Sequence, residues 1–218
     1  MTRCYFVRHA RTAWNHQDRL QGHSDLPLDA VGEAQAKCVG AFFAPRTLRG
    51  IFTSSLARSR QTAEAIAAGT TQETDPVIVP ELAEMHLGAW EGLTPLEIDE
   101  RFAGAYQQWK RKPSSVTIPS AEPHEAFRVR VRRAVAELRT ALGEGDYAVV
   151  SHGGVIAAVL ADTLGADYDL VIRRLRLDNG GITALEFGSG VPHVLCINWT
   201  AHLDRSPADG EPVPALQR

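Results

Sequence analysis

Short apolar runs alternate with amphipathic helical stretches along this sequence, and that alternation restricts the possible folds more than any other feature. Apolar runs typical of buried strands occupy residues 4–7, 50–54, 77–79, 147–150, 182–187 and 194–199. Helical periodicity lies between them, over 29–42, 56–68, 125–142 and 153–164. Strands that alternate with helices form mostly parallel sheets with helices on both faces. We therefore expect an α/β fold, a three-layer α/β/α sandwich around a mostly parallel central sheet.

Residues 81–123 break this alternation, because Trp, Gly and Pro divide them into short helical pieces. We interpret this stretch as a small cap inserted over the sheet. At 218 residues the chain is long enough for one well-packed domain, which we expect to span residues 1–203. Residues 204–218 are rich in Pro, Asp and Gly, so a flexible tail is predicted there.

The composition argues against several classes of protein. The net charge is −3, which argues against a nucleic-acid-binding protein that relies on bulk positive charge. No apolar run approaches the roughly 20 residues that a membrane-spanning helix needs. The cysteines Cys4, Cys38 and Cys196 are odd in number and scattered, which is typical of reduced proteins. We expect a cytoplasmic protein with no membrane and no nucleic-acid partner.

Charged and polar residues follow three of the predicted strands. Arg8 and His9 end the first strand, Arg58 follows the second, and Ser-His-Gly-Gly at 151–154 ends a later one. Because the carboxyl ends of parallel strands meet at one edge of a sheet, these groups are expected to lie together. Two like charges about 5 Å apart repel by roughly 3 kcal/mol at an effective dielectric near 20. Each group alone also fits an ordinary core, surface or turn position, but their combination predicts a site for a phosphate-sized anion.

Five motifs in a fixed order extend this pattern over most of the chain. They are the segments 8–15 (RHARTAWN), 19–22 (RLQG), 54–63 (SSLARSRQTA), 84–92 (EMHLGAWEG) and 151–154 (SHGG). Together they resemble the histidine phosphatase superfamily, whose fold is phosphoglycerate-mutase-like. The resemblance runs from about residue 5 to residue 202.

The resemblance implies a catalytic set of five residues. His9 would attack phosphorus and form a phosphohistidine, which splits one difficult displacement into two easier ones. Arg8, Arg58 and His152 would hold the phosphoryl oxygens and stabilise their charge. Glu84 would protonate the leaving oxygen and then activate water. Metal ions and cofactors have no role in this scheme.

The same resemblance implies a second group of residues that would contact the substrate: Asn15, Gln21, Gly22, Gly153, Arg11, His86 and Glu122. The superfamily commonly has Glu at position 11. Arg11 therefore indicates either a substrate with a second anionic group or a surface role. Glu91, a carboxylate close to Glu84, is interpreted as the anchor of a turn.

The short cap favours a phosphatase over a mutase, because mutases of this fold have a longer cap with more cations. The expected activity is hydrolysis of a small phosphomonoester, either a sugar phosphate or a phosphoglycerate-type metabolite. A phosphoglycerate-mutase-type phosphotransferase and a non-catalytic protein that binds phosphorylated ligands are the alternatives. A homodimer stays open, since no motif determines the oligomeric state.

Overall fold

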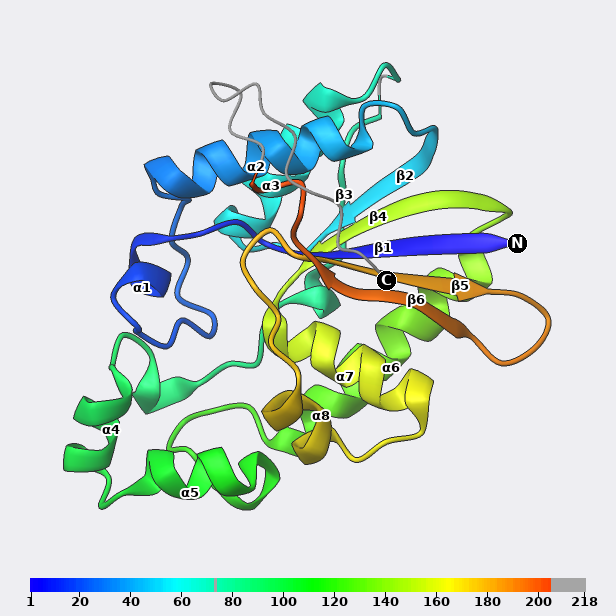
Figure 1. Ribbon diagram of the computed structural model, residues 1–218. Coiled ribbons are helices and arrows are strands. Elements are labelled where there is room, and N and C mark those ends of the chain that lie inside the picture. Colours follow the sequence, from blue (N-terminus) through cyan, green and yellow to red (C-terminus); the bar gives the residue numbers. More distant parts are fainter. Residues whose placement is uncertain (73, 205–218) are drawn as a thin grey trace, which may run out of the picture.

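A six-stranded sheet forms the middle layer of the computed structural model, which describes residues 1–72 and 74–204 (Figure 1). Its strand order is β3-β2-β4-β1-β5-β6. The strands are β1 (Thr2–Arg8), β2 (Leu48–Thr53), β3 (Val77–Ile78), β4 (Gly145–Ser151), β5 (Ile182–Phe187) and β6 (His193–Trp199). The first four pair in parallel, whereas β5 pairs antiparallel with β1 and with β6. The expected mostly parallel sheet is confirmed. Apart from Asp204, the tail expected at 204–218 lies outside the described residues.

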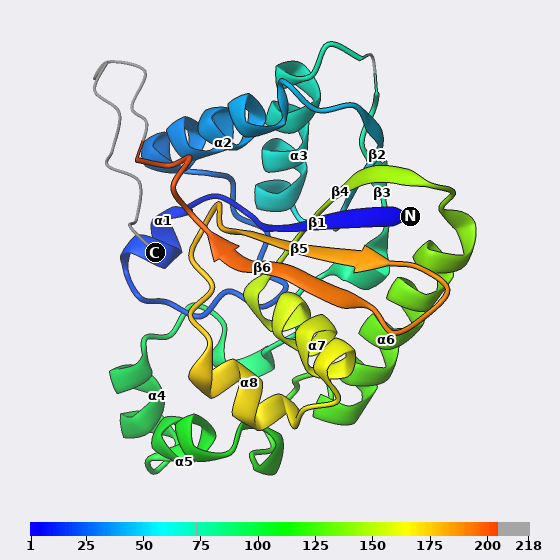
Figure 2. The same cartoon turned by 45° about the vertical axis from the view of Figure 1, so that its right-hand side comes forward.

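Helices cover both faces of the sheet, which confirms the three-layer prediction (Figures 1 and 2). One face carries α2 (Ala30–Phe43) and α3 (Ala57–Gly69), and the other carries α6 (His124–Ala141), α7 (Gly153–Leu164) and α8 (Tyr168–Arg174). The side chains of β1 alternate between the two layers, as a strand requires. Tyr5 and Val7 join the core under α2 and α3, while Cys4 and Phe6 join the core under α6 and α7.

Local sequence signals explain where the principal helices begin and end. Asp29 precedes α2, and its carboxylate accepts a hydrogen bond from the Gly32 N–H at 2.8 Å, as an N-cap does. Gly165 ends α7 in the left-handed region at φ 61°, where glycine is the least strained residue. The four-residue helix α1 (Ala13–His16) has a capping box at its N-terminus, formed by Thr12 and Asn15.

The cap lies between β3 and α6 and has its own small core. It consists of η1 (Pro80–Leu82), η2 (Gly88–Trp90), α4 (Pro95–Arg101), α5 (Ala105–Arg111) and η3 (Pro113–Ser115). Trp90, Ile98 and Ile118 are buried together in it. Ser114 ties the cap to α8, because its N–H and hydroxyl donate to the Asp169 carboxylate at 2.9 and 2.6 Å. Within residues 1–72 and 74–204, no helix has both the length and the apolar character needed to cross a membrane.

Candidate active site

Three parallel strand ends meet at one edge of the sheet and bring the expected catalytic residues together. The register places Arg8 of β1 opposite Ser151 of β4. The His9 N–H donates to the Ser151 carbonyl at 2.9 Å, and the rings of His9 and His152 lie 5.1 Å apart between centroids. A cavity of about 860 Å³ opens at this edge, and its wall includes Arg8, His9, Arg58 and Glu84. His152 is fully buried beside His9 and is not itself part of the wall.

The hydrogen bonds of His9 determine which ring nitrogen carries the proton. Nδ1 lies 2.8 Å from the Ala10 carbonyl, and the Arg58 Nε–H points at Nε2 from 3.3 Å. Because the guanidinium can only donate, Nε2 is the acceptor and the ring proton sits on Nδ1. Burial, and then the charges of Arg58 and Arg8, lower the pKa of His9 well below its usual range. The ring is therefore neutral, with the Nε2 lone pair on the side of Arg58.

Arg58 is held from three sides near the start of α3. Besides its contact with His9, it donates to the carbonyls of Ser24 and Gly22, each at 2.8 Å. It therefore fixes the loop that follows Gln21. Burial is the main cause that lowers the pKa of Arg58 to about 10, so the guanidinium keeps its charge at neutral pH.

Arg8 and His152 leave buried polar atoms without partners among the described residues. Arg8 donates from Nη1 to the Leu177 carbonyl, but its Nε has no partner. Nε2 of His152 lies 2.8 Å from the Ser54 hydroxyl, and its Nδ1 has no partner. Burial, followed by the charge of Arg58, lowers the pKa of His152 well below its usual range. Buried polar groups are rarely left unpaired, so these atoms indicate where an anion would bind.

Glu84 sits against the N-terminus of α7. Its Oε2 accepts from the Gly154 N–H at 3.0 Å, and its Oε1 accepts from the Met85 N–H at 2.9 Å. A carboxylate is favoured there by the partial positive charge of the helix end. A Cβ atom at position 154 would overlap Oε1 of Glu84, so the close approach depends on glycine.

Arg130 of α6 holds the backbone that carries Glu84. Its Nη1 donates to the carbonyls of Glu81 and Ala83 at 2.6 and 2.9 Å, and its Nη2 donates to the Glu84 carbonyl at 3.2 Å. Glu122 pairs with the same guanidinium through both oxygens, at 2.8 and 2.7 Å. Glu122 is therefore committed to Arg130 and does not line the cavity.

Arg11 and His86 also lie away from the cavity wall, contrary to their assignment as substrate contacts. The Arg11 Nε pairs with the Asp29 carboxylate at 3.0 Å, so the residue that caps α2 also neutralises this arginine. Nε2 of His86 lies 3.6 Å from Oε1 of Glu91. Arg11 and Glu122 are thus paired with Asp29 and Arg130, respectively, whereas His86 lies only near Glu91.

The other four expected contacts, Asn15, Gln21, Gly22 and Gly153, do line the cavity. Asn15 accepts from the Thr12 N–H at 3.1 Å through Oδ1, which leaves its amide N–H₂ for a ligand. Gly22 has φ 51°, and a Cβ there would overlap Oε1 of Glu91. Glu91 also accepts from the N–H groups of His23 and Leu87 at 2.8 and 3.0 Å, which joins the two loops beside the cavity.

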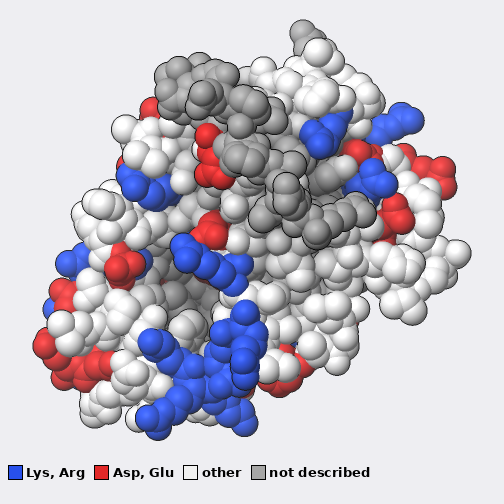
Figure 3. All heavy atoms as spheres, in the orientation of Figure 1, with Lys and Arg blue, Asp and Glu red and all other residues white. Residues whose placement is uncertain are grey.

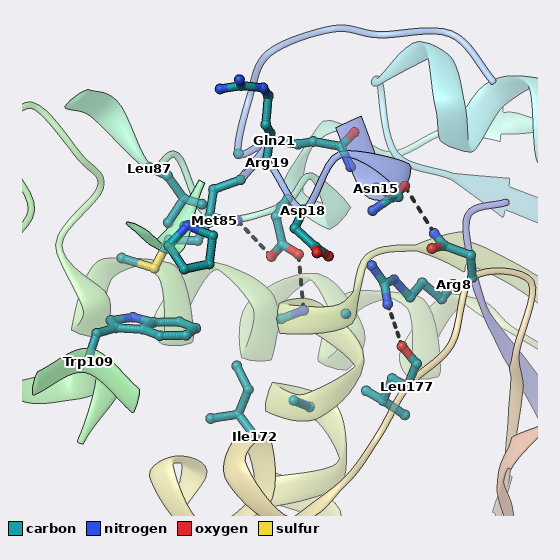
Figure 4. A pocket seen from close by; sticks show the side chains of 18 of the residues that line it. Arg8, Asn15, Asp18, Arg19, Gln21, Met85, Leu87, Trp109, Ile172 and Leu177 are labelled. Atoms are coloured by element: carbon teal, nitrogen blue, oxygen red, sulfur yellow. Dashed lines mark hydrogen bonds between the residues drawn. The ribbon is translucent and has the colours of Figure 1, made fainter. Parts of the chain in front are cut away.

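Further wall residues come from segments that the sequence patterns did not associate with the site. Figure 4 shows Asp18, Arg19, Trp109, Ile172 and Leu177 around the same space as Arg8. Tyr106, Tyr168, Leu175 and Asn179 complete this group. The Asn179 amide donates to the His9 carbonyl at 3.0 Å. Apart from Arg19, which stands in the segment 19–22, no motif marked these residues.

Sequence comparison places this fold and site in a known class. The sequence profile of the histidine phosphatase superfamily (branch 1) matches residues 4–200. The chain belongs to this superfamily, as its motifs suggested.

The names of individual relatives refer to different activities. A 2-carboxy-D-arabinitol-1-phosphatase of Triticum aestivum is 32% identical over 213 residues, which cover 96% of this chain and 42% of the wheat protein. The chain thus spans less than half the length of that relative. A probable phosphoglycerate mutase of Photorhabdus laumondii subsp. laumondii is 32% identical over 193 residues, 86% of each chain.

Solved structures agree with the fold over nearly the whole chain. YhfR of Bacillus stearothermophilus superposes with a TM-score of 0.85 at 28% identity, covering 93% of this chain and 100% of that one. A mycobacterial glucosyl-3-phosphoglycerate phosphatase in complex with VO3 gives a TM-score of 0.81 at 28% identity, covering 91% and 99%.

Proposed function

We propose that this protein is a phosphatase that hydrolyses small phosphomonoesters through a phosphohistidine on His9. The observation that carries the proposal is the neutral, buried imidazole of His9 in the cavity wall, whose Nε2 accepts a hydrogen bond from Arg58 and carries no proton. A neutral ring is the form that can attack phosphorus. The unpartnered Nε of Arg8, a residue of the cavity wall, is the group that would receive a phosphoryl oxygen.

The reaction has two displacements at the same phosphorus. In the first, which requires Glu84 to be protonated when the phosphate ester is bound, Nε2 of His9 forms a bond to phosphorus while the bond to the alcohol oxygen breaks, and Glu84 gives that oxygen its proton. In the second, Glu84 takes a proton from water, the water oxygen attacks phosphorus, and the bond to Nε2 breaks. Inorganic phosphate leaves, and His9 and Glu84 return to their starting states. Arg8 and Arg58 offset the charge on the phosphoryl oxygens throughout.

Phosphate transfer to water is preferred over transfer to a second substrate hydroxyl for two reasons. The cap is short, and phosphatases occur among both the relatives and the similar structures. A mutase is the second candidate, because probable phosphoglycerate mutases are similar at 32% identity. A non-catalytic binding protein is disfavoured, because nucleophile, cations and proton donor are all present.

A phosphomonoester panel assayed in EDTA, with wild-type protein and His9→Ala, tests the proposal. We expect phosphate release that EDTA does not change, and a loss on the order of 10³-fold or more in His9→Ala. Acid-labile, base-stable phosphoryl protein should accumulate in Glu84→Gln. Full activity in His9→Ala, or activity abolished by EDTA, would contradict the proposal. Isomerised phosphoester without free phosphate would identify a mutase.

A further inference from the structure

Beyond the phosphoryl site, the cavity is walled mainly by apolar and aromatic side chains. Figure 4 shows Arg8 and Trp109 at opposite ends, with Ile172 and Leu177 along one side and Met85 near Trp109. The rings of Trp109 and Tyr106 are stacked, with centroids 5.6 Å apart and an interplanar angle of 22°. Met85 directly follows Glu84, the proposed proton donor, so the alcohol part of a substrate would leave the reacting centre beside this apolar wall.

Among the described residues, each arginine of the cavity wall already has a polar partner or lies at the phosphoryl end. Every side-chain nitrogen of Arg58 has a partner within the site. Arg19 pairs with Glu97 at 2.8 Å and donates to the Gly92 carbonyl at 2.6 Å. Arg8 lies at the phosphoryl end. Asp18, by contrast, is a solvent-exposed residue at the edge of the cavity that has no ion pair among the described residues, and it adds negative charge there.

We propose that the substrate is a phosphomonoester of a bulky, uncharged alcohol with an apolar or aromatic body, and that Trp109 is the residue that selects it. This inference rests on the proposed phosphatase activity. Trp109 offers a large, rigid contact surface at little cost in conformational entropy. A second anionic group in the alcohol would lose water without gaining a cation and would face Asp18, so it is selected against. A cavity of about 860 Å³ is also far larger than a phosphate ion needs.

Three phosphomonoesters of primary alcohols test the selection, because their leaving groups are chemically similar. They are 2-naphthylmethyl phosphate, the same compound with a carboxylate at ring position 6, and glycerol 3-phosphate. At 0.15 M salt we expect kcat/KM to be highest for 2-naphthylmethyl phosphate, by about tenfold over each of the others. The reverse order for either comparison in the wild-type protein would overturn the inference.

Two variants test whether Trp109 and Asp18 cause the selection. Trp109→Ala should lower kcat/KM for 2-naphthylmethyl phosphate about tenfold through KM, and should change glycerol 3-phosphate less than about twofold. Asp18→Asn should raise kcat/KM for the carboxylated compound about threefold or more. Trp199→Ala is the matched control, since Trp199 is 48% exposed on β6 and lies outside this cavity.

The outcomes separate this inference from the function on which it rests. If none of the three compounds releases phosphate while another ester of the phosphomonoester panel does, the phosphatase proposal stands and the inference is wrong. If no ester of the panel releases phosphate, both fail. If all three are hydrolysed at equal kcat/KM, or if Trp109→Ala and Trp199→Ala behave alike, the phosphatase proposal stands and the inference is wrong. If Trp109→Ala does not fold, the kcat/KM values of the three compounds in the wild-type protein still test the preference for an uncharged, apolar alcohol.

Discussion

At the scale of single residues, the site depends on two histidines that are kept neutral by their surroundings. Burial, followed by the charge of Arg58, lowers the pKa of both His9 and His152 well below the usual value. A neutral His9 is ready to attack, but the unfolded chain would bind protons at these positions more readily than the folded protein does. The catalytic arrangement therefore makes stability depend on pH.

We expect the free energy of unfolding to fall as pH falls below about 6.5, the ordinary pKa of histidine in an unfolded chain. Above that pH, neither the folded nor the unfolded chain carries the extra proton, so the histidines no longer make the stability depend on pH. One pH unit below it, each such histidine should lower the stability by about 1.4 kcal/mol. Urea unfolding at pH 7.5 and pH 5.5 measures the difference. His152→Gln should show a pH dependence smaller by about that amount, with the exposed His193→Gln as control. An identical pH dependence in His152→Gln and the wild type would contradict the prediction.

Single residues also show where sequence reasoning reached its limit. The five residues proposed as catalytic could be expected to lie together because each stands in a motif at a strand end or in the segment after one. Arg11, His86 and Glu122 could not be placed, because their positions depend on which neighbouring group pairs with them. Asp29 caps α2 and pairs with Arg11 at once. The sequence indicates Asp29 as the N-cap of α2, but it does not show that the same carboxylate also pairs with Arg11.

At the scale of elements, the start of α7 sets the position of the proton donor. Gly154→Ala should displace the Glu84 carboxylate, because a Cβ would overlap its Oε1. A shift of about 1 Å in a catalytic group costs on the order of 10²-fold in rate. Stability should change little, because alanine favours a helix and the displaced atoms end a flexible side chain.

Turnover and thermal melting of Gly154→Ala, measured side by side, check this expectation. Gly143→Ala is the control, because a Cβ there meets no atom within 4 Å. Wild-type kcat in Gly154→Ala would show that the contact between Glu84 and the helix start is dispensable.

Helix α6 contributes a second positioning element through Arg130. Arg130→Gln should lower kcat about 10- to 100-fold with little change in KM, because the segment carrying Glu84 loses its three carbonyl anchors while the phosphate-binding groups remain. Arg130→Lys should restore activity only in part, since an ammonium lacks the fork that holds Glu122. Arg133→Gln on the same helix is the control, as the Arg133 side chain is 76% exposed. Equal losses in both Gln variants would refute the role of Arg130.

The long elements and the short strand β3 could be predicted from the sequence, but helix α8 could not. The seven-residue α8 was not expected, and its stability comes from tertiary contacts such as the buried Tyr168 and the bonds of Asp169 to Ser114. The antiparallel direction of β5 was also unspecified, because strand patterning does not encode direction. Since α8 and the segment after it supply Ile172, Leu175 and Leu177, the substrate side of the cavity was less predictable than the phosphate side.

At the scale of the whole molecule, charge is distributed unevenly although the net charge is only −3. Figure 3 shows Lys and Arg side chains gathered over α5 and α8. We call this group the cationic rim; its exposed members are Lys110, Arg111, Lys112, Arg173, Arg174 and Arg176. The rim residues adjoin the wall residues Trp109, Ile172 and Leu175 in sequence, yet none of them lines the cavity. The rim can therefore attract any phosphate dianion from a distance, while the wall distinguishes the alcohol.

We expect this rim to speed substrate association at low salt. In Lys110→Glu/Arg174→Glu, kcat/KM at about 10 mM salt should fall roughly 3- to 10-fold, because opposite potential at a cleft raises the encounter rate. At about 0.5 M salt the loss should shrink below twofold, since screening then acts over a few ångströms. The value of kcat should stay constant at both salt concentrations, because the exposed rim touches no reacting atom. Lys37→Glu/Arg49→Glu changes the net charge equally from exposed positions on α2 and β2, and it should have a much smaller effect. Equal losses in the two double variants would show that net charge, rather than the rim, governs association.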